Sequence, residues 1–306
     1  MTTLVDIPLA GAGGEPVDFA RTIASHGVVE LPPNRLDFAA HALETTLAVD
    51  GGARTLRLSR NDDHARIALV AGQADTAMRR ELARVVRYML RLDEDLSDFY
   101  ELCTADPDLD WCASGAGRML RSPTVFEDVV KTILTTNTAW SGTTKMATAL
   151  VDHLGAEAPG GGRAFPTPAA MAGVEETFYR ETVRAGYRAA YLVRLATDVA
   201  DGTVELETLA DPELSDDDVA ARLLALPGVG PYAAAHVMLI SLGRYSRLVL
   251  DSWTRPTYSR LVGAKRQLKD TTIERRFGRY GRWAGLAFWL YLTRSWVDGD
   301  AGTDTS

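Results

Sequence analysis

The chain has 306 residues, of which 46% are hydrophobic and 24% charged, a composition typical of a globular protein with one large domain or two. Its apolar runs are too short to span a membrane, and its first residues lack the basic leader and apolar core of a secretory signal. The only cysteines, Cys103 and Cys112, are too few for a disulfide framework or a four-cysteine iron–sulfur site. We therefore expect a cytoplasmic protein with reduced thiols.

Residues 1–95 are predicted to form a small α+β domain. Alternating apolar and polar residues, separated by turn-forming segments, predict antiparallel strands at 28–31, 43–49, 54–58 and 65–70. Apolar residues at helical spacing then predict a helix over 76–92.

Residues 96–296 are predicted to form an all-α domain. Ser122 before Pro123 indicates one helix start, and Ser215 before three aspartates indicates another. Further helical patterns cover 143–154, 168–172, 175–185, 189–201, 216–225 and 231–242. The acidic residues 297–306 are expected to be a disordered tail. The expected fold class is therefore mainly α, with an N-terminal α+β part.

The charge is distributed unevenly along the chain. The formal net charge is −8, but the segment 244–294 holds twelve Lys or Arg residues against Asp251, Asp270 and Glu274. Such asymmetry favours a nucleic-acid partner. The alternative is a solvated, arginine-rich helix face.

A glycine-rich hairpin joins two of the predicted helices. Its sequence is Leu226-Pro227-Gly228-Val229-Gly230, and Pro231 fits the first position of the second helix. Such a turn directs free backbone N–H groups outward, which suits a phosphate. Asp251, at the end of the following apolar segment, is a candidate for chemistry on a bound substrate. An ordinary turn between two helices is the alternative.

Four segments together resemble the helix-hairpin-helix DNA glycosylase superfamily, and most closely its alkyladenine and oxoguanine branches. They are the hairpin with Asp251, the segment from Ser122 through Thr135-Thr136-Asn137-Thr138, the segment Gly186-Tyr187-Arg188-Ala189-Ala190-Tyr191, and Tyr280-Gly281-Arg282-Trp283. The resemblance covers roughly 95–294 and implies a helix-hairpin-helix glycosylase fold with a small antiparallel sheet domain.

The resemblance also implies roles for individual residues. Asp251 would be the catalytic carboxylate, and Asn137 and Thr138 would fill the gap left by an extruded base. The DNA backbone would be held by the hairpin and its neighbours: Gly228, Val229, Gly230, Tyr232 and Arg255. No metal held by side chains is expected, and no metal-ligand spacing is seen. A monovalent cation, Na⁺ or K⁺, is expected at the hairpin backbone.

Three departures from the family narrow the reaction. Tyr232 occupies the position at which some members carry the lysine that forms a Schiff base for strand cleavage. Gly285 replaces the glutamine with which oxoguanine enzymes read the base, and Trp253 stands where that branch often has histidine. The iron–sulfur cysteines of other branches are absent. Lys145 is expected to be a solvated helix lysine rather than a substitute nucleophile.

Aromatic residues are candidates for a stacking pocket around a flipped, alkylated base. These are Trp140, Tyr187, Trp253, Phe288 and Trp289, although core packing explains Phe288 and Trp289 equally well. His236, on an apolar helix, is expected to be a packed histidine.

The sequence thus predicts a monofunctional DNA glycosylase that excises an alkylated or oxidised base in base-excision repair. Its partner would be double-stranded DNA, and it would act as a monomer in the cytoplasm, at the nucleoid if prokaryotic. Two alternatives remain: a non-catalytic helix-hairpin-helix protein that binds DNA or recognises damage, and a helical protein-interaction module.

Overall fold

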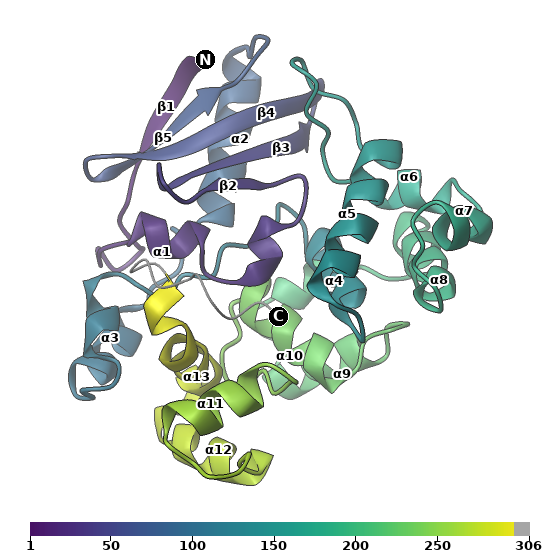
Figure 1. The fold of residues 1–306 in the computed structure, drawn as a ribbon. Helices are drawn as coiled ribbons and strands as arrows, with labels where there is room; N and C mark the ends of the chain where they lie inside the picture. The colour runs from purple at the N-terminus through teal and green to yellow at the C-terminus, as the bar shows by residue number, and fades with distance from the viewer. Residues whose placement is uncertain (297–306) are drawn as a thin grey trace.

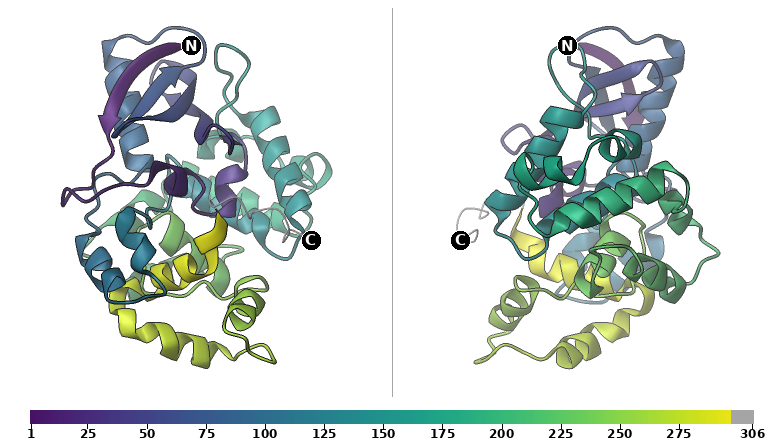
Figure 2. Two further views of the ribbon diagram at one scale, coloured as in Figure 1. Left: turned by 60° about the vertical axis from the view of Figure 1, so that its left-hand side comes forward. Right: turned by 90° about the vertical axis from the view of Figure 1, so that its right-hand side faces the viewer.

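The structure is a computed structural model that describes residues 1–296. The disordered tail expected at 297–306 lies outside the described residues. A five-stranded sheet with helix α2 (Thr76–Met89) forms one end of the molecule, and helices α11 (Thr254–Leu261) and α12 (Asp270–Phe277) form the other (Figure 1 and Figure 2).

The sheet is antiparallel, with strand order β1-β5-β4-β3-β2. Its strands are β1 (Thr2–Pro8), β2 (Arg35–Asp37), β3 (Ala42–Val49), β4 (Gly52–Asn61) and β5 (His64–Leu69). Alternate residues of β5, including Ile67, are buried and share one apolar cluster with Leu82 and Val86 of α2. The three predicted central strands and the antiparallel sheet are confirmed, whereas β1 and β2 were not predicted.

The strand predicted at 28–31 is wrong. Gly27–Glu30 forms a short 3-10 helix, η1. Pro32 and Pro33 follow it, and because proline lacks an N–H it cannot donate to a strand ladder. The apolar residues of this segment instead serve two cores, since Val28 packs with the helices and Val29 with the sheet.

The remaining regular elements are all helices, joined by loops. In chain order the elements are α1 (Phe19–Ile23), α3 (Ser97–Thr104), η2 (Asp110–Ser114), α4 (Val125–Thr135), α5 (Trp140–Leu154), α6 (Pro168–Ala172), α7 (Glu176–Glu181), α8 (Arg188–Ala200), η3 (Leu206–Ala210), α9 (Asp216–Leu224), α10 (Pro231–Ile240), η4 (Gly278–Trp283), α13 (Ala284–Thr293) and η5 (Arg294–Trp296). Within 1–296, no helix combines the length and apolar character needed to cross a bilayer.

The two predicted helix caps had different outcomes. Ser215 caps α9 as predicted, because its hydroxyl accepts the Asp218 N–H at 3.1 Å. Helix α4 begins later than predicted, and its cap is Thr124, whose hydroxyl accepts the Glu127 N–H at 3.2 Å. The Ser122 N–H instead donates to the buried Asp128 carboxylate, so this residue belongs to the approach to the helix.

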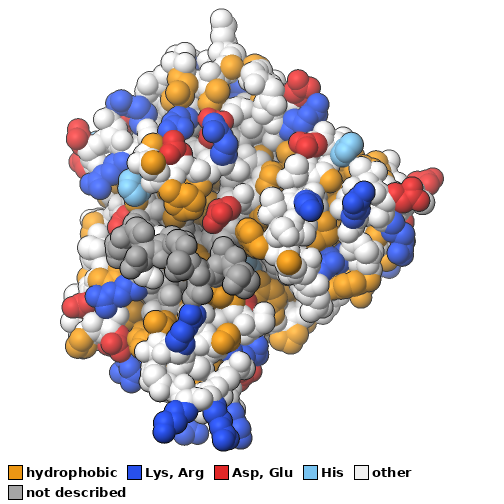
Figure 3. Space-filling view, in the orientation of Figure 1, with side chains coloured by type: hydrophobic (Ala, Val, Ile, Leu, Met, Phe, Trp, Pro, Cys, Tyr) orange, Lys and Arg blue, Asp and Glu red, His pale blue; other side chains and the backbone are white. Residues whose placement is uncertain are grey.

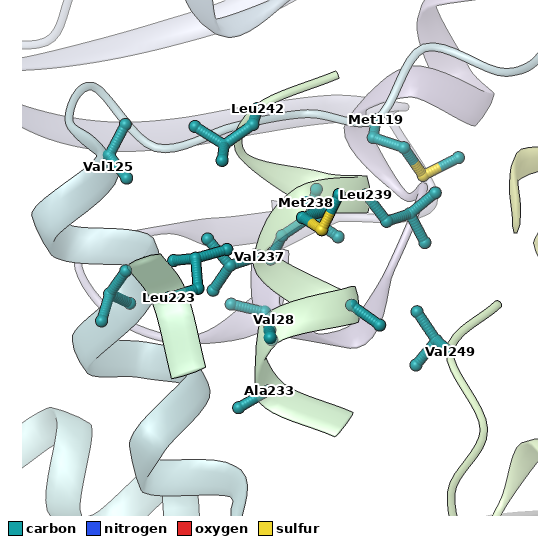
Figure 4. Close-up of a cluster of buried hydrophobic side chains, with 14 of the residues drawn as sticks. Val28, Met119, Val125, Leu223, Ala233, Val237, Met238, Leu239, Leu242 and Val249 are labelled. Atoms are coloured by element: carbon teal, nitrogen blue, oxygen red, sulfur yellow. The ribbon is translucent and has the colours of Figure 1, made fainter. Parts of the chain in front are cut away.

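Helix α10 lies at the centre of the helical core. Every residue from Ala233 to Ile240 is buried, as expected for a helix that is apolar on all sides. Side chains from several segments surround it, including Val125, Leu223 and Val249 (Figure 4). Because α10 is enclosed, the hairpin that precedes it is held in a fixed position.

A buried charge network joins the end of α10 to the sheet end of the molecule. The Arg91 guanidinium donates to the Ile240 and Met119 carbonyls, each at 2.6 Å, and pairs with Glu94 at 2.5 Å. The Tyr245 hydroxyl donates to the same Glu94 carboxylate at 3.1 Å. Since buried charges are costly unless they are paired and hydrogen-bonded, this network restrains the junction between the two parts.

Candidate active site

The two hairpin glycines differ in backbone conformation and in the space around them. Gly228 has φ +81°, and a Cβ there would lie 2.8 Å from the Tyr191 ring, so both the backbone and the packing require glycine. Gly230 has φ −99°, and a Cβ there would meet no atom within 4 Å. The open space in front of Gly230 is therefore available to a ligand.

The hairpin leaves backbone groups of both kinds without partners. Among the described residues, the N–H groups of Gly228, Gly230 and Tyr232 donate to no acceptor, and the carbonyls of Pro227, Gly228 and Val229 accept no hydrogen bond. Free N–H groups before a helix N-terminus suit an anion. Free carbonyl oxygens suit a hard cation, so the residues present fit both a phosphate and the expected monovalent ion.

Asp251 holds the first N–H groups of helix α11 with one carboxylate oxygen and leaves the other free. Oδ1 accepts the N–H groups of Trp253 at 2.8 Å and Thr254 at 2.6 Å, while the Thr254 hydroxyl accepts the Asp251 N–H at 2.9 Å. Among the described residues, Oδ2 has no hydrogen-bond partner, and Asp251 is half-buried. The arrangement gives a firmly oriented carboxylate with one oxygen available for chemistry.

The Asp251 charge acts on side chains of the first turns of α10. Burial, together with this charge, raises the pKa of Tyr232 to about 12. The Tyr232 phenol is therefore protonated at neutral pH, and it lies 3.2 Å from the Thr135 hydroxyl. Burial lowers the pKa of His236 to about 4, although the Asp251 charge opposes that shift. His236 is thus a buried, neutral histidine, as predicted.

An aromatic cluster borders this carboxylate. The Trp253, Trp289 and Trp296 rings contact one another, with centroids 5.5–6.0 Å apart. Trp289 also contacts His236, which stacks on Tyr232 at 5.6 Å and an interplanar angle of 14°. Trp289 is nearly fully buried, and its indole N–H donates to the Ser25 carbonyl at 2.8 Å. Of the predicted pocket residues, Trp253 and Trp289 therefore lie together.

Tyr187 and Trp140 lie apart from the ring contacts of that cluster. The exposed Asn137, with φ +46°, donates from its amide to the Tyr187 hydroxyl at 3.1 Å. Arg188 pins the same loop, because its guanidinium donates to the Thr136 carbonyl and hydroxyl. Trp140 follows the exposed Thr138 and packs against Gly27, where a Cβ would lie 3.5 Å from the ring. Phe288 is fully buried in the core.

At least half of the cationic side chains in the predicted basic segment form ion pairs. Arg255 forms a two-pronged pair with Asp270 at 2.7 and 2.9 Å. Five other arginines of the segment also pair with acids, namely Arg244, Arg247, Arg276, Arg279 and Arg282. Within the described chain, Lys265, Arg266 and Lys269 are exposed and form no ion pair. Cationic side chains gather at this end of the molecule, over the α11–α12 connection (Figure 3).

The structure also brings two residues to the site that the sequence did not indicate. The His26 ring, from the start of η1, lies edge-to-face with His236 at 6.1 Å. Trp296 completes the tryptophan cluster from the end of the described chain. No local pattern marks either residue, because each reaches the site only through long-range packing. In residues 1–296, no group of three or more His, Cys, Asp or Glu side chains is placed to hold a metal.

The fold is similar to solved structures of DNA repair enzymes. It matches a 3-methyladenine DNA glycosylase from Archaeoglobus fulgidus with a TM-score of 0.72 and 22% identity, covering 94% of this chain and 98% of that one. It matches MBOgg1, solved with a low-affinity DNA ligand, with a TM-score of 0.71 and 21% identity, covering 92% of this chain and 93% of that one. The architecture is therefore that of the helix-hairpin-helix DNA glycosylases, as expected.

The sequence comparisons agree with that class over shorter segments. No known family model matches the sequence. The chain is 33% identical over 134 residues to the N-glycosylase/DNA lyase OGG1 of Arabidopsis thaliana, covering 40% of this chain and 36% of that protein. It is 28% identical over 80 residues to a putative DNA-3-methyladenine glycosylase of Bacillus subtilis, covering 26% and 27%. The matched segments thus span little more than a third of these curated relatives at most. The resemblance to the alkyladenine and oxoguanine branches is confirmed.

Proposed function

We propose that the protein is a DNA glycosylase that removes an alkylated or oxidised base from double-stranded DNA. The observation that carries this proposal is the Asp251 carboxylate, which is oriented by two backbone N–H groups through Oδ1 and keeps Oδ2 free. It lies after a hairpin whose N–H groups have no acceptors among the described residues. Backbone N–H groups that can bind a phosphate, together with an oriented carboxylate, suit chemistry on a nucleotide.

The chemistry follows from the electrostatics of the site. The target nucleotide must leave the duplex, at a cost of roughly a few kcal/mol that is smallest for a damaged or mispaired base. The bond between the sugar C1′ and the base nitrogen then breaks, and the base departs with the electron pair. Asp251 stabilises the positive charge that develops on the sugar. Water adds at C1′ and loses its proton to Asp251 or to solvent.

The DNA contacts divide between the backbone and the vacated base position. A phosphate would bind at the free N–H groups of Gly228 and Gly230, and the hairpin carbonyls would hold Na⁺ or K⁺, which would add positive charge there. Asn137 and Thr138, exposed on a loop that Arg188 holds, fill the gap left by the flipped base. Arg255 remains a candidate phosphate contact. Its ion pair with Asp270 makes it a weaker one than the sequence alone suggests. The enzyme would act where the DNA lies, which in a bacterium is the nucleoid in the cytoplasm.

We further propose that the enzyme has no lyase activity. Strand cleavage through a Schiff base requires a nucleophilic amine. Tyr232 supplies a phenol with a pKa of about 12 instead. Lys145 is exposed on α5, and the buried Lys131 pairs with Glu127 at 2.6 Å, so neither presents a free amine beside Asp251.

The aromatic cluster favours an alkylated base. Trp253 is only partly buried, so its ring can meet a ligand, and an aromatic face attracts a cation more strongly than a neutral base. Gly285, in place of a base-reading glutamine, carries no side chain that could contact an oxidised guanine, and a Cβ there would clash with the Arg247 carbonyl. Both observations rank alkylated bases ahead of oxidised ones.

The test is an excision assay with purified protein on duplexes carrying alkylated, oxidised and deaminated bases, each with and without alkali. Release of at least one alkylated base, with strand breaks only after alkali, is the expected result. Tight binding to every damaged duplex without release of any base would favour the rival function, a non-catalytic damage-recognition protein. Salt-independent or undetectable DNA binding would contradict both and favour a protein-interaction module.

A further inference from the structure

Two buried imidazoles form part of the wall behind the aromatic cluster. His26 and His236 are 3% and 4% exposed, and they come from opposite parts of the fold, η1 and α10. Their rings meet edge-to-face at 6.1 Å, and His236 also contacts the Tyr232 and Trp289 rings. The pair therefore adjoins the site proposed for the flipped base.

The hydrogen bonding of His26 fixes its tautomer. Its Nε2 lies 2.6 Å from the Leu120 carbonyl oxygen. A carbonyl only accepts hydrogen bonds, so Nε2 carries the proton and donates it. Since burial lowers the pKa of His26 to about 3, the ring is neutral and Nδ1 presents a bare lone pair. His26 Nδ1 is thus an acceptor.

That acceptor has no partner, and neither does the equivalent atom of His236. Both Nδ1 atoms are buried without a hydrogen bond. Two polar groups on rings that contact His236 are already engaged, because the Trp289 indole donates to the Ser25 carbonyl and the Tyr232 hydroxyl pairs with Thr135. Leaving a buried polar atom unsatisfied costs about 1–3 kcal/mol, so such an atom beside a binding site points to a ligand group as its partner.

We propose that His26 and His236 determine which base the pocket prefers, because their ring nitrogens form hydrogen bonds with N–H groups of the flipped base. The inference rests on the proposed glycosylase function and names its preferred substrate class: a purine, alkylated and positively charged, that presents N–H donors. The neutral imidazoles suit a cationic base because they add no like charge, while the partly buried Trp253 ring attracts it. A base whose donors are blocked leaves the Nδ1 atoms unpaired and is disfavoured.

The test compares two damaged adenines in the same duplex. 3-Methyladenine is cationic in the nucleotide and keeps its exocyclic amino group, whereas 1,N6-ethenoadenine is neutral and has that group locked in a ring. Single-turnover excision is measured for the wild type, His236→Phe, His236→Gln and His26→Gln. Phenylalanine keeps the stacking on Tyr232 but removes the ring nitrogens, and glutamine restores hydrogen-bonding capacity. Melting temperatures identify any variant that fails to fold.

We expect the wild type to prefer 3-methyladenine. His236→Phe should lower that rate on the order of tenfold while changing the ethenoadenine rate less than about twofold, and His236→Gln should recover part of the loss. Equal losses on both bases would assign the pair a purely structural role and overturn the inference. If His236→Phe does not fold, the two glutamine variants carry the comparison, and rate changes that are equal for the two bases refute the inference. A wild type that excises neither base, nor any other in the panel above, refutes the proposed function and the inference with it.

Discussion

The Tyr232 hydroxyl lies 3.2 Å from the Thr135 hydroxyl and thereby links the first turn of α10 to the end of α4. The same two elements carry the hairpin and the loop that contains Asn137. The Asn137 amide in turn donates to Tyr187, and Tyr191 packs on Gly228. Three segments far apart in the sequence are therefore bound to one another beside the hairpin, so a change in one is expected to alter the others.

The first prediction concerns Tyr232→Phe. Phenylalanine keeps the ring that stacks on His236 but removes the hydroxyl that meets Thr135. We expect a loss of about 0.5–1.5 kcal/mol in the free energy of unfolding, measured by denaturant titration. Because the phenol is not proposed to react, base release should persist, and borohydride should trap no covalent DNA complex in the wild type or the variant. Trapping in the wild type would contradict the assignment of a monofunctional enzyme.

The second prediction concerns Asp251→Asn. The amide oxygen still accepts the N–H groups of Trp253 and Thr254, so the cap of α11 and the fold are retained. The negative charge is lost, and we expect single-turnover excision to fall about 100-fold or more. DNA affinity, measured by fluorescence anisotropy, should change little. Asp251→Ala serves as the contrast, since it removes the cap as well and should cost about 1 kcal/mol of stability.

The third prediction uses the two hairpin glycines as a matched pair. Gly228→Ala places a methyl group on a left-handed backbone and 2.8 Å from the Tyr191 ring, so it should destabilise the protein by about 1–3 kcal/mol. Gly230→Ala meets no protein atom within 4 Å and should leave the melting temperature nearly unchanged. Its methyl group would crowd the proposed phosphate, so DNA affinity should fall. Normal affinity in Gly230→Ala would place the phosphate elsewhere.

The fourth prediction concerns the cations of the α11–α12 connection. Neutralising Lys265 and Arg266 together as glutamines should weaken DNA binding and reduce its salt dependence by about one unit of slope for each phosphate that the variant no longer neutralises. The control neutralises Arg80 and Arg84, which are also exposed but lie on α2 at the sheet end. If the control weakens binding as much as the test variant, only the net charge matters, and the α11–α12 connection does not bind DNA.

The sequence predicted those parts of the fold that short-range patterns determine. The helix from Asp216, with its serine cap, and the hairpin before Pro231 depend on neighbouring residues, and the structure has both. Strands β1 and β2 were missed because one pairs with β5, some sixty residues away, and the other is three residues long. The ion pair between Arg255 and Asp270 was missed because it depends on how α11 and α12 pack.

In the candidate site, too, the sequence predicted the residues that belong to a local motif and missed those that long-range packing brings together. Asp251 and the glycines were found because a motif fixes their spacing. His26 was not, since nothing near it in the sequence distinguishes it, and only the packing of η1 against α10 brings it to His236. The prediction that Trp140 and Tyr187 line one pocket with Trp253 stays untested. The structure places Tyr187 in contact with Asn137, and Trp140 lies just after Thr138. Composition identifies aromatic residues but cannot say which of them share a cluster.

The fifth prediction concerns how the free energy of unfolding changes with pH. Two buried histidines and a buried aspartate shift it in opposite directions. The folded-state pKa of His236 is lowered to about 4, so between pH 4 and 6.5 the unfolded chain binds a proton that the folded protein does not. His26, lowered to about 3, behaves in the same way. Both stabilise fully above pH 6.5, and their contribution is lost as pH falls. Burial raises the pKa of Asp128 to about 6, so its protonated form favours the fold, and that contribution is lost as pH rises from 4 to 6.

The opposite pH dependences contributed by the histidines and by Asp128 can be separated by denaturant titrations at several values between pH 4.5 and 6. His236→Phe should reduce the rise of the unfolding free energy with pH by up to about 1.4 kcal/mol per pH unit. Asp128→Asn should increase that rise by a similar amount, because it removes the opposing group while its amide oxygen still accepts the Ser122 N–H. Leu4→Ala, a change of an apolar residue near the sheet cluster, should lower stability without changing the slope. Slopes that move in the same direction for both variants would contradict the opposite protonation states assigned to His236 and Asp128.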